Sequence, residues 1–234
     1  MENNSTNKNI LVVLAHPDDE SYGMGGTLAK FADLGAQIVL ICATRGEAGI
    51  QGIEPERAGQ IRERELKQAA ENLNIRLFFL DYLDGTLSQL ETKIFAQQLS
   101  IWIATVEPGL IITFGPDGVS GHPDHIAVSK AVNWAVEHYF PNINLLYLAA
   151  SEATKLGCGV TETIHHSRHL ISVDISDFKL AKVKAIQSHK SQNKELTGIP
   201  ESELEKIACF ENFSIANMSE GQKETLKWFK EKAK

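Results

Sequence analysis

The chain is poor in cysteine: its 234 residues include three, at Cys42, Cys158 and Cys209, and no CxxC pair. An odd number of widely spaced cysteines argues against a disulfide framework and against a cysteine-ligated zinc site. Basic residues are also in deficit, because 23 Lys and Arg face 30 Asp and Glu and leave a net charge of -7. A nucleic-acid binder needs a basic excess to meet phosphates, so we expect no nucleic-acid partner.

Long apolar runs are missing as well. No stretch approaches the eighteen consecutive apolar residues of a transmembrane helix, so we expect no membrane span. The first residues, MENNSTNKN, are polar and lack the apolar core of a signal peptide. We therefore interpret residues 1–9 as a flexible tail and residues 10–234 as one domain, with a cytoplasmic location as the default.

Short apolar runs alternate with longer helix-forming segments. We expect strands at 10–15, 37–43, 76–80, 110–114, 144–150 and 170–175, and helices at 27–34, 58–73, 87–106, 124–139, 176–189 and 219–232. This alternation is typical of an α/β fold, a Rossmann-like open and mainly parallel sheet with helices on both faces. With the strand order 3-2-1-4-5, ligands bind outside the carboxyl ends of the first and fourth strands. The segments after Ala15 and Phe114 are therefore the ones to inspect.

Both segments contain a His-Pro-Asp tripeptide. AHPDDE occupies residues 15–20, and GHPDH occupies residues 121–125. In a chain with eight His and seven Pro, chance would supply roughly 0.01 such tripeptides. One copy can be only a turn, since Pro and Asp favour turns, but two copies at one edge of the sheet favour a shared site.

These residue types suit a catalytic zinc ion, which takes neutral imidazole nitrogens and carboxylate oxygens from three protein ligands and keeps a water. The spacing of His16 and Asp19 lets one turn bring both side chains to one ion. One His of the second segment, His122 or His125, completes the set. Asp18 is then free to act as a base on the water, and the remaining His can face a substrate carbonyl.

Further motifs follow in order. They are TRGEAG at 44–49, R..EL..AA..L at 62–73 and K.KAIQSHKSQ at 182–192. Together with the two His-Pro-Asp motifs they span residues 15–192, and the sequence resembles the LmbE-like, PIG-L family of zinc-dependent N-acetylglucosaminyl deacetylases. The two His-Pro-Asp motifs are specific, whereas each of the others alone would be weak.

The resemblance implies a ligand set and a base. By it, His16, Asp19 and His125 are the Zn²⁺ ligands, Asp18 is the general base, and His122 stabilises the oxyanion. It further implies a Rossmann-like fold, hydrolysis of the N-acetyl group of an N-acetylglucosamine-containing substrate, a small-molecule amino-sugar partner and a homo-oligomer.

Four further residues have competing interpretations. By the resemblance, Asp124 orients a catalytic imidazole and Arg62 lies near the active site. On sequence alone, Arg62 in a helix of mixed charge is more typical of a solvated face. Glu47 lies in a Gly-rich loop and could contact substrate or cap a helix. His189 ends a helix, where a cation suits the helix dipole, or it could serve the site.

Two alternative functions stay open. Gly23, Gly25 and Gly26 resemble part of a dinucleotide-binding loop, which would indicate a metal-free Rossmann nucleotide-binding protein. However, GxGxxG is not met in register, and the second strand ends at Thr44-Arg45 without the expected acid. The other alternative is a family member that only binds sugar, but every expected catalytic residue type is present. We therefore expect a zinc-dependent N-deacetylase.

Overall fold

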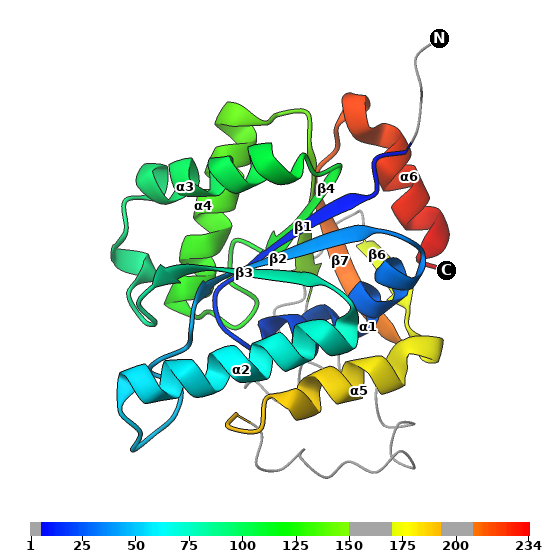
Figure 1. The fold of residues 1–234 in the computed structure, drawn as a ribbon. Helices are drawn as coiled ribbons and strands as arrows, with labels where there is room; N and C mark the ends of the chain where they lie inside the picture. The colour runs from blue at the N-terminus through cyan, green and yellow to red at the C-terminus, as the bar shows by residue number, and fades with distance from the viewer. Residues whose placement is uncertain (1–5, 150–169, 193–207) are drawn as a thin grey trace.

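The computed structural model describes residues 6–149, 170–192 and 208–234 (Figure 1). Most of the tail expected at residues 1–9 lies outside the described residues, as does Cys158. The flexible tail therefore stays a prediction. Within the described ranges, no helix is long and apolar enough to cross a membrane.

The described residues form one seven-stranded sheet in the order β3-β2-β1-β4-β5-β7-β6. The five strands β1 to β5 are parallel, and β7 is antiparallel to both of its neighbours. The strands are β1 (Asn9–Leu14), β2 (Gln37–Thr44), β3 (Arg76–Tyr82), β4 (Leu110–Phe114), β5 (Asn144–Ala149), β6 (Leu170–Asp174) and β7 (Phe210–Asn217). The α/β class and the 3-2-1-4-5 order are thus confirmed.

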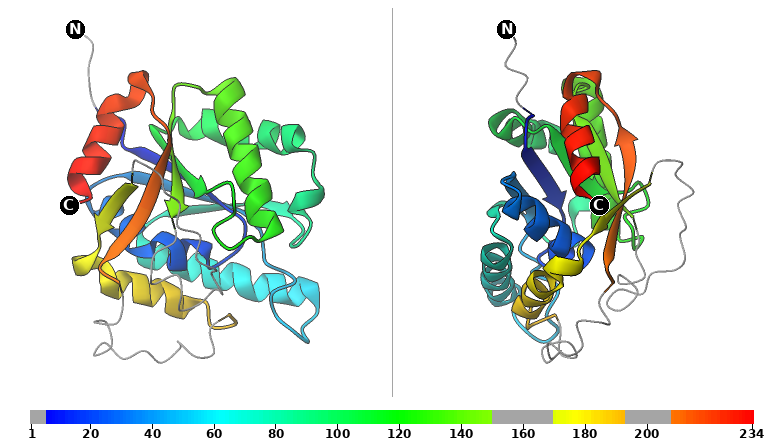
Figure 2. Two further views of the ribbon diagram at one scale, coloured as in Figure 1. Left: turned by 180° about the vertical axis from the view of Figure 1, so that it is seen from behind. Right: turned by 90° about the vertical axis from the view of Figure 1, so that its right-hand side faces the viewer.

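Helices cover both faces of this sheet (Figures 1 and 2). On one side lie α1 (Asp19–Asp33), α2 (Pro55–Leu73) and α5 (Lys179–Ser188), and on the other lie α3 (Thr92–Val106) and α4 (Pro123–Tyr139). The helix α6 (Lys223–Lys232) stacks Phe229 on Phe31 of α1, with ring centroids 4.2 Å apart. Because both faces are covered, the central strands β1 and β4 are buried almost end to end, which explains their continuous apolar runs.

The first helix differs from its expected bounds. It begins at Asp19 and not at Thr27, so the glycine-rich segment is helical and the loop expected there is wrong. Packing explains these glycines. A Cβ on Gly26 would lie 2.5 Å from the Ile175 side chain, and one on Gly23 would lie 3.1 Å from Leu148. These glycines let neighbouring elements approach the helix closely, which argues against a dinucleotide-binding loop.

Two other elements were misjudged from the sequence. The helix expected from Leu87 begins at Thr92, preceded by the 3₁₀ turn η1 (Leu87–Gln89). The strand β7 was not expected, because polar residues such as Glu211 interrupt its apolar pattern, although Glu211 itself is buried. Short 3₁₀ turns also precede α5, as η3 (Ser176–Phe178), and α6, as η5 (Glu220–Gln222).

Candidate active site

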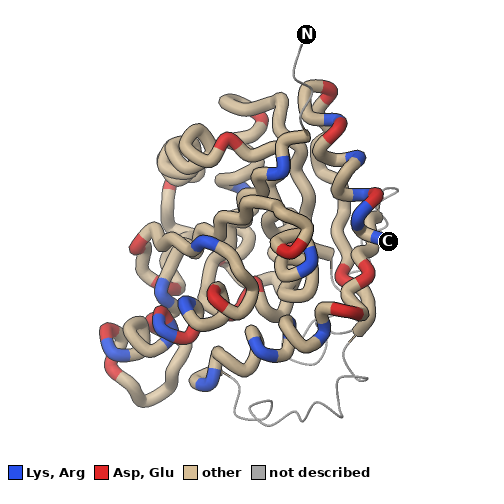
Figure 3. Tube along the Cα trace, turned by 45° about the vertical axis from the view of Figure 1, so that its right-hand side comes forward, with Lys and Arg blue, Asp and Glu red and all other residues tan. Residues whose placement is uncertain are grey.

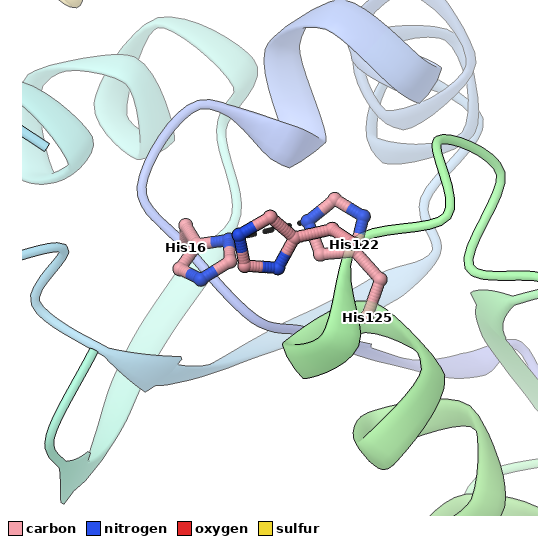
Figure 4. A group of neighbouring side chains, drawn as sticks. All are labelled: His16, His122 and His125. Atoms are coloured by element: carbon pink, nitrogen blue, oxygen red, sulfur yellow. Dashed lines mark hydrogen bonds between the residues drawn. The ribbon is translucent and has the colours of Figure 1, made fainter. Parts of the chain in front are cut away.

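Three imidazoles meet at the carboxyl ends of β1 and β4. His16 follows β1, whereas His122 and His125 lie at the start of α4 (Figure 4). The Nδ1 atom of His16 is 3.2 Å from Nε2 of His125. The ring of His122 lies beside both, with centroids 4.8 Å from His16 and 5.0 Å from His125. The two His-Pro-Asp segments are 106 residues apart in the sequence, from His16 to His122, and they share one site.

Asp19 joins this cluster through both of its carboxylate oxygens. Oδ2 is 3.7 Å from Nδ1 of His16, and Oδ1 is 3.3 Å from Nε2 of His125. Ligand atoms bound tetrahedrally to one zinc ion at about 2.1 Å lie about 3.4 Å from each other. The separations among His16, Asp19 and His125 are close to that value, so these donors fit a small divalent cation. His122 is also within reach of a shared ion with the other two imidazoles.

Two carboxylates hold the far side of the His16 ring. Its Nε2 atom is 3.1 Å from Asp84 Oδ1 and 3.3 Å from Asp124 Oδ2. Asp124 is itself fixed by the amides of Gly85 and Leu87, at 2.8 and 3.0 Å. Burial lowers the pKa of His16, but Asp124 and Asp84 raise it to about 10. A carboxylate behind a ligand imidazole keeps the hydrogen on the outer nitrogen and turns the other nitrogen to the metal.

Sequence reasoning missed Asp84. The signal that could have found it is the pair Asp84-Gly85 directly after β3, at the same carboxyl edge as the two His-Pro-Asp segments. Asp84 also accepts a hydrogen bond from the Ala48 amide at 3.0 Å, and its own amide donates to Glu47 Oε2 at 3.3 Å. Glu47 thus joins the 45–49 loop to the turn after β3.

The other two imidazoles are oriented by backbone contacts. His125 donates from Nδ1 to the Gly118 carbonyl at 3.0 Å and stacks on Phe114, so that its Nε2 faces Asp19. Burial lowers the pKa of His125, but the Asp19 carboxylate more than offsets this and raises it. His122 accepts the Asp124 amide on Nδ1 at 3.2 Å as the N-cap of α4. Burial and the adjacent His16 lower the pKa of His122, so its neutral ring carries the hydrogen on Nε2. The imidazole that the Asp124 carboxylate contacts is therefore that of His16.

Asp18 has a strained backbone, with φ of 118° at a residue that carries a Cβ. Such a conformation costs roughly 1–3 kcal/mol and is retained where the surroundings enforce it. Here the Asp18 amide donates to Glu20 Oε2 at 3.1 Å, and the Asp18 carboxylate accepts a hydrogen bond from Arg62 Nη2 at 3.3 Å. Burial raises the pKa of Asp18 to about 7, although Arg62 acts in the opposite direction.

Arg62 lies on the inner side of a helix of mixed charge. Lys and Arg are interspersed with Asp and Glu along α2 (Figure 3), but Arg62 is only 4% exposed, so the solvated-face interpretation is wrong. Its guanidinium donates to the Gly46 carbonyl at 3.1 Å and to the Pro17 carbonyl at 2.5 Å. A Cβ on Gly46 or Gly49 would overlap Nη1. The glycines of TRGEAG thus form the cradle of this arginine.

His189 lies inside the protein and not at its surface. It is fully buried, and its Nε2 atom is 2.8 Å from Glu20 Oε1. Burial lowers the pKa of His189, but Glu20 and Asp18 more than offset this and raise it. Its Nδ1 atom has no hydrogen-bond partner among the described residues. Contact of His189 or Glu47 with substrate stays a prediction.

Similarity to known proteins agrees with this arrangement. Residues 11–136 match the PIG-L family, described as GlcNAc-PI de-N-acetylase. A probable N-acetyl-α-D-glucosaminyl L-malate deacetylase 2 of Bacillus cereus is 33% identical over 196 residues, covering 81% of this chain and 86% of that protein. The chain belongs to the PIG-L family. The resemblance drawn from the sequence motifs is thereby confirmed.

Other relatives of this PIG-L protein differ more in length. The 1D-myo-inositol 2-acetamido-2-deoxy-α-D-glucopyranoside deacetylase of Kineococcus radiotolerans is 31% identical over 180 residues, 63% of this chain, and the chain spans about half (47%) of that relative. Among solved structures, the N,N'-diacetylchitobiose deacetylase of Pyrococcus horikoshii superimposes with a TM-score of 0.68 at 21% identity, covering 89% of this chain and 84% of that one. At that identity the likeness shows the fold.

The cradle of Arg62 makes a prediction about two glycines of one loop. Both Gly46 (φ 68°) and Gly52 (φ 77°) have left-handed backbones. Of these two, a Cβ on Gly46 would overlap Arg62, whereas a Cβ on Gly52 would meet no atom within 4 Å. Gly46→Ala should therefore lower the free energy of unfolding by about 1–3 kcal/mol more than Gly52→Ala, because overpacking adds to the backbone strain. Urea unfolding followed by circular dichroism measures both. Equal losses would show that Arg62 moves aside and that the cradle is loose.

The positive φ of Asp18 predicts that a glycine variant at this position is more stable than an alanine variant. Asp18→Gly and Asp18→Ala remove the same carboxylate, but only the alanine keeps a Cβ at φ of 118°. The glycine variant should be the more stable of the two by about 1 kcal/mol, against the usual advantage of alanine. Urea unfolding of the two proteins side by side tests this, and a more stable alanine variant would mean that the backbone strain is absent in solution.

Proposed function

We propose that this PIG-L protein is a zinc-dependent hydrolase that removes the N-acetyl group from a conjugate of N-acetylglucosamine. The observation that carries this proposal is the convergence of His16 Nδ1, His125 Nε2 and the Asp19 carboxylate, with the partly buried Asp18 directly beside them. Family membership and the two relatives named as deacetylases of N-acetylated glucosamine conjugates support it.

Two imidazole nitrogens and one carboxylate are the protein ligands of many catalytic zinc sites, and His16, His125 and Asp19 would hold the ion. When bound, the ion supplies Lewis acidity toward the acetyl carbonyl and acidifies water. Protons compete with the metal ion for these ligand atoms, because an imidazole nitrogen must be deprotonated to bind a metal. The carboxylates that raise the pKa of His16 also supply the negative charge that attracts a cation.

Asp18 would accept a proton from the attacking water. Its pKa of about 7 matches a general base that works near neutral pH. Arg62 would hold Asp18 in place through the side chain and through the Pro17 carbonyl. His122 would donate from Nε2 to the acetyl oxygen as negative charge develops there. The oxygen of water ends in acetate, and the amine leaves with a proton from Asp18 or His122.

Two competing functions remain testable beside this one. A family member that only binds sugar would keep the metal and the substrate but release no acetate. A metal-free nucleotide-binding protein would hold neither, and the packing of Gly23 and Gly26 against Leu148 and Ile175 speaks against it. A panel of N-acetylglucosaminyl malate, the inositol conjugate and N,N'-diacetylchitobiose, assayed for acetate with the zinc content measured on the same sample, separates these cases. The cytoplasmic location and the homo-oligomer expected from the sequence stay predictions.

The ligand assignment predicts which variants lose the metal. His16→Ala, Asp19→Ala and His125→Ala should each lower the zinc content of the purified protein from about one ion per chain to a small fraction. His122→Ala is the matched control: its ring lies in the same cluster, but its Nδ1 accepts the Asp124 amide and its Nε2 therefore carries the hydrogen, which leaves no lone pair for the ion. Elemental analysis after dialysis measures the content. Retention of zinc by all three ligand variants, or its loss from the control, would refute the assignment.

The role of Asp18 predicts a loss of turnover without a loss of metal. Asp18→Asn should release acetate at least about 100-fold more slowly, the usual effect of removing a general base. The exposed Asp33, at the other end of α1, offers the control Asp33→Asn, which should stay within about two-fold of wild type because surface positions rarely matter. If Asp18→Asn retains its activity within a few-fold, the base lies elsewhere, and Glu20 is the next residue to replace.

A further inference from the structure

Helix α1 is broken between the part that carries active-site residues and the part that packs in the core. Met24 lies at the break, with φ of -150° and ψ of 18°. The short first part starts at Asp19, directly after the strained Asp18, and is tied to it because the amides of Ser21 and Tyr22 both donate to the Asp18 carbonyl. The angle of this first part therefore determines where Asp18 and Asp19 point.

A buried ion pair sits at this break. In an unbroken helix the Gly26 amide donates to the Tyr22 carbonyl. Here the Gly26 amide donates to Glu211 Oε1 at 3.1 Å, and the Tyr22 carbonyl accepts from Lys182 Nζ at 2.8 Å. Lys182 and Glu211 pair at 2.5 Å, and the Thr27 amide donates to Glu211 Oε2 at 2.7 Å. The ion pair thus binds backbone groups on both sides of Met24, namely the Tyr22 carbonyl and the Gly26 and Thr27 amides.

The two residues of the pair come from elements that are distant in sequence, and both are buried. Lys182 lies on α5 and is 2% exposed, and Glu211 lies on β7 and is 1% exposed. Burial of charges is unfavourable unless every charge is hydrogen-bonded, and here both partners also satisfy backbone groups of α1. Gly25 makes room for this approach, since a Cβ there would lie 3.3 Å from Lys182 Cγ. The glycine-rich segment therefore lets Lys182 approach the backbone at the break in α1.

We propose that the Lys182–Glu211 pair is a positioning device for the metal site. It binds the Tyr22 carbonyl on one side of the break and the Gly26 and Thr27 amides on the other, holds the first turn of α1 at its angle, and so aims Asp19 at the cation and Asp18 at the attacking water. Neither residue touches the reacting groups. The inference rests on the metal site of the proposed function, and it adds two residues that lie outside that site.

The test compares variants of the pair with a control on the same helix. Lys182→Met leaves Glu211 unpaired, whereas the double variant Lys182→Met/Glu211→Gln leaves no buried lone charge and remains informative if the single variant folds poorly. The control is Lys30→Met. Lys30 lies on the second part of α1 and donates to the Asp174 carbonyl at 2.8 Å, so its loss affects the core side of the break alone.

Three readouts separate positioning from stability. These are the dissociation constant for Co²⁺ by calorimetry, the visible absorption spectrum of bound Co²⁺, which reports ligand geometry, and hydrogen exchange of residues 18–27 in the metal-free protein. The pair variants should bind Co²⁺ about 10- to 100-fold more weakly, as for the loss of other outer-shell partners, with an altered spectrum and faster exchange in residues 18–27. Lys30→Met should lower the melting temperature but leave all three readouts unchanged.

The outcomes are distinct for the two proposals. If wild type binds Co²⁺ and the double variant binds it equally well with the same spectrum, the pair is merely structural and the inference is overturned alone. If Lys30→Met weakens Co²⁺ binding as much as the pair variants do, general destabilisation explains the effect and the inference is likewise overturned. If wild type itself binds no Co²⁺, the metal site is overturned and the inference with it.

Discussion

Four ionisable side chains follow one another closely at the end of a buried strand, and each must find a partner there. His16, Asp18, Asp19 and Glu20 all lie within five residues of sequence, directly after β1. An unpaired charge in such a place is costly, so the surrounding elements are arranged to meet them. The partners come from across the chain and are Asp84 and Asp124 for His16, Arg62 for Asp18, His125 for Asp19, and His189 for Glu20.

This constraint explains why so much of the sequence around the site is glycine. Charged side chains can reach a buried turn only if backbones approach closely, and glycine permits that. Gly46 and Gly49 admit the guanidinium of Arg62, and Gly25 admits Lys182 to the break in α1. The same packing enforces the backbone of Asp18, so local strain is balanced by contacts elsewhere. A site of this kind trades stability for a fixed geometry.

Much of the fold could be predicted because its signals are local. The parallel strands β1, β2, β4 and β5 are short apolar runs because helices cover both faces of the sheet there, whereas the edge strand β3 is only half-buried. The alternation of strands with helices predicts a parallel sheet, and the order 3-2-1-4-5 is one that such sheets commonly adopt. Strand β7 could not be recognised, because its buried Glu211 breaks the apolar pattern and is accommodated only by Lys182 and by the amides of α1. Neither segment by itself predicts that its charged residue is buried, because the partner lies elsewhere in the sequence.

The sequence by itself determined the two His-Pro-Asp segments and hence the kind of chemistry, because residue type and spacing limit which ions and which bases a turn can offer. Only the tertiary structure decided which groups act together. Three features depend on contacts between residues far apart in the chain. They are the burial of Arg62, the carboxylates of Asp84 and Asp124 behind His16, and the break in α1. Such contacts follow from how the strands and helices pack, and local pattern does not encode them.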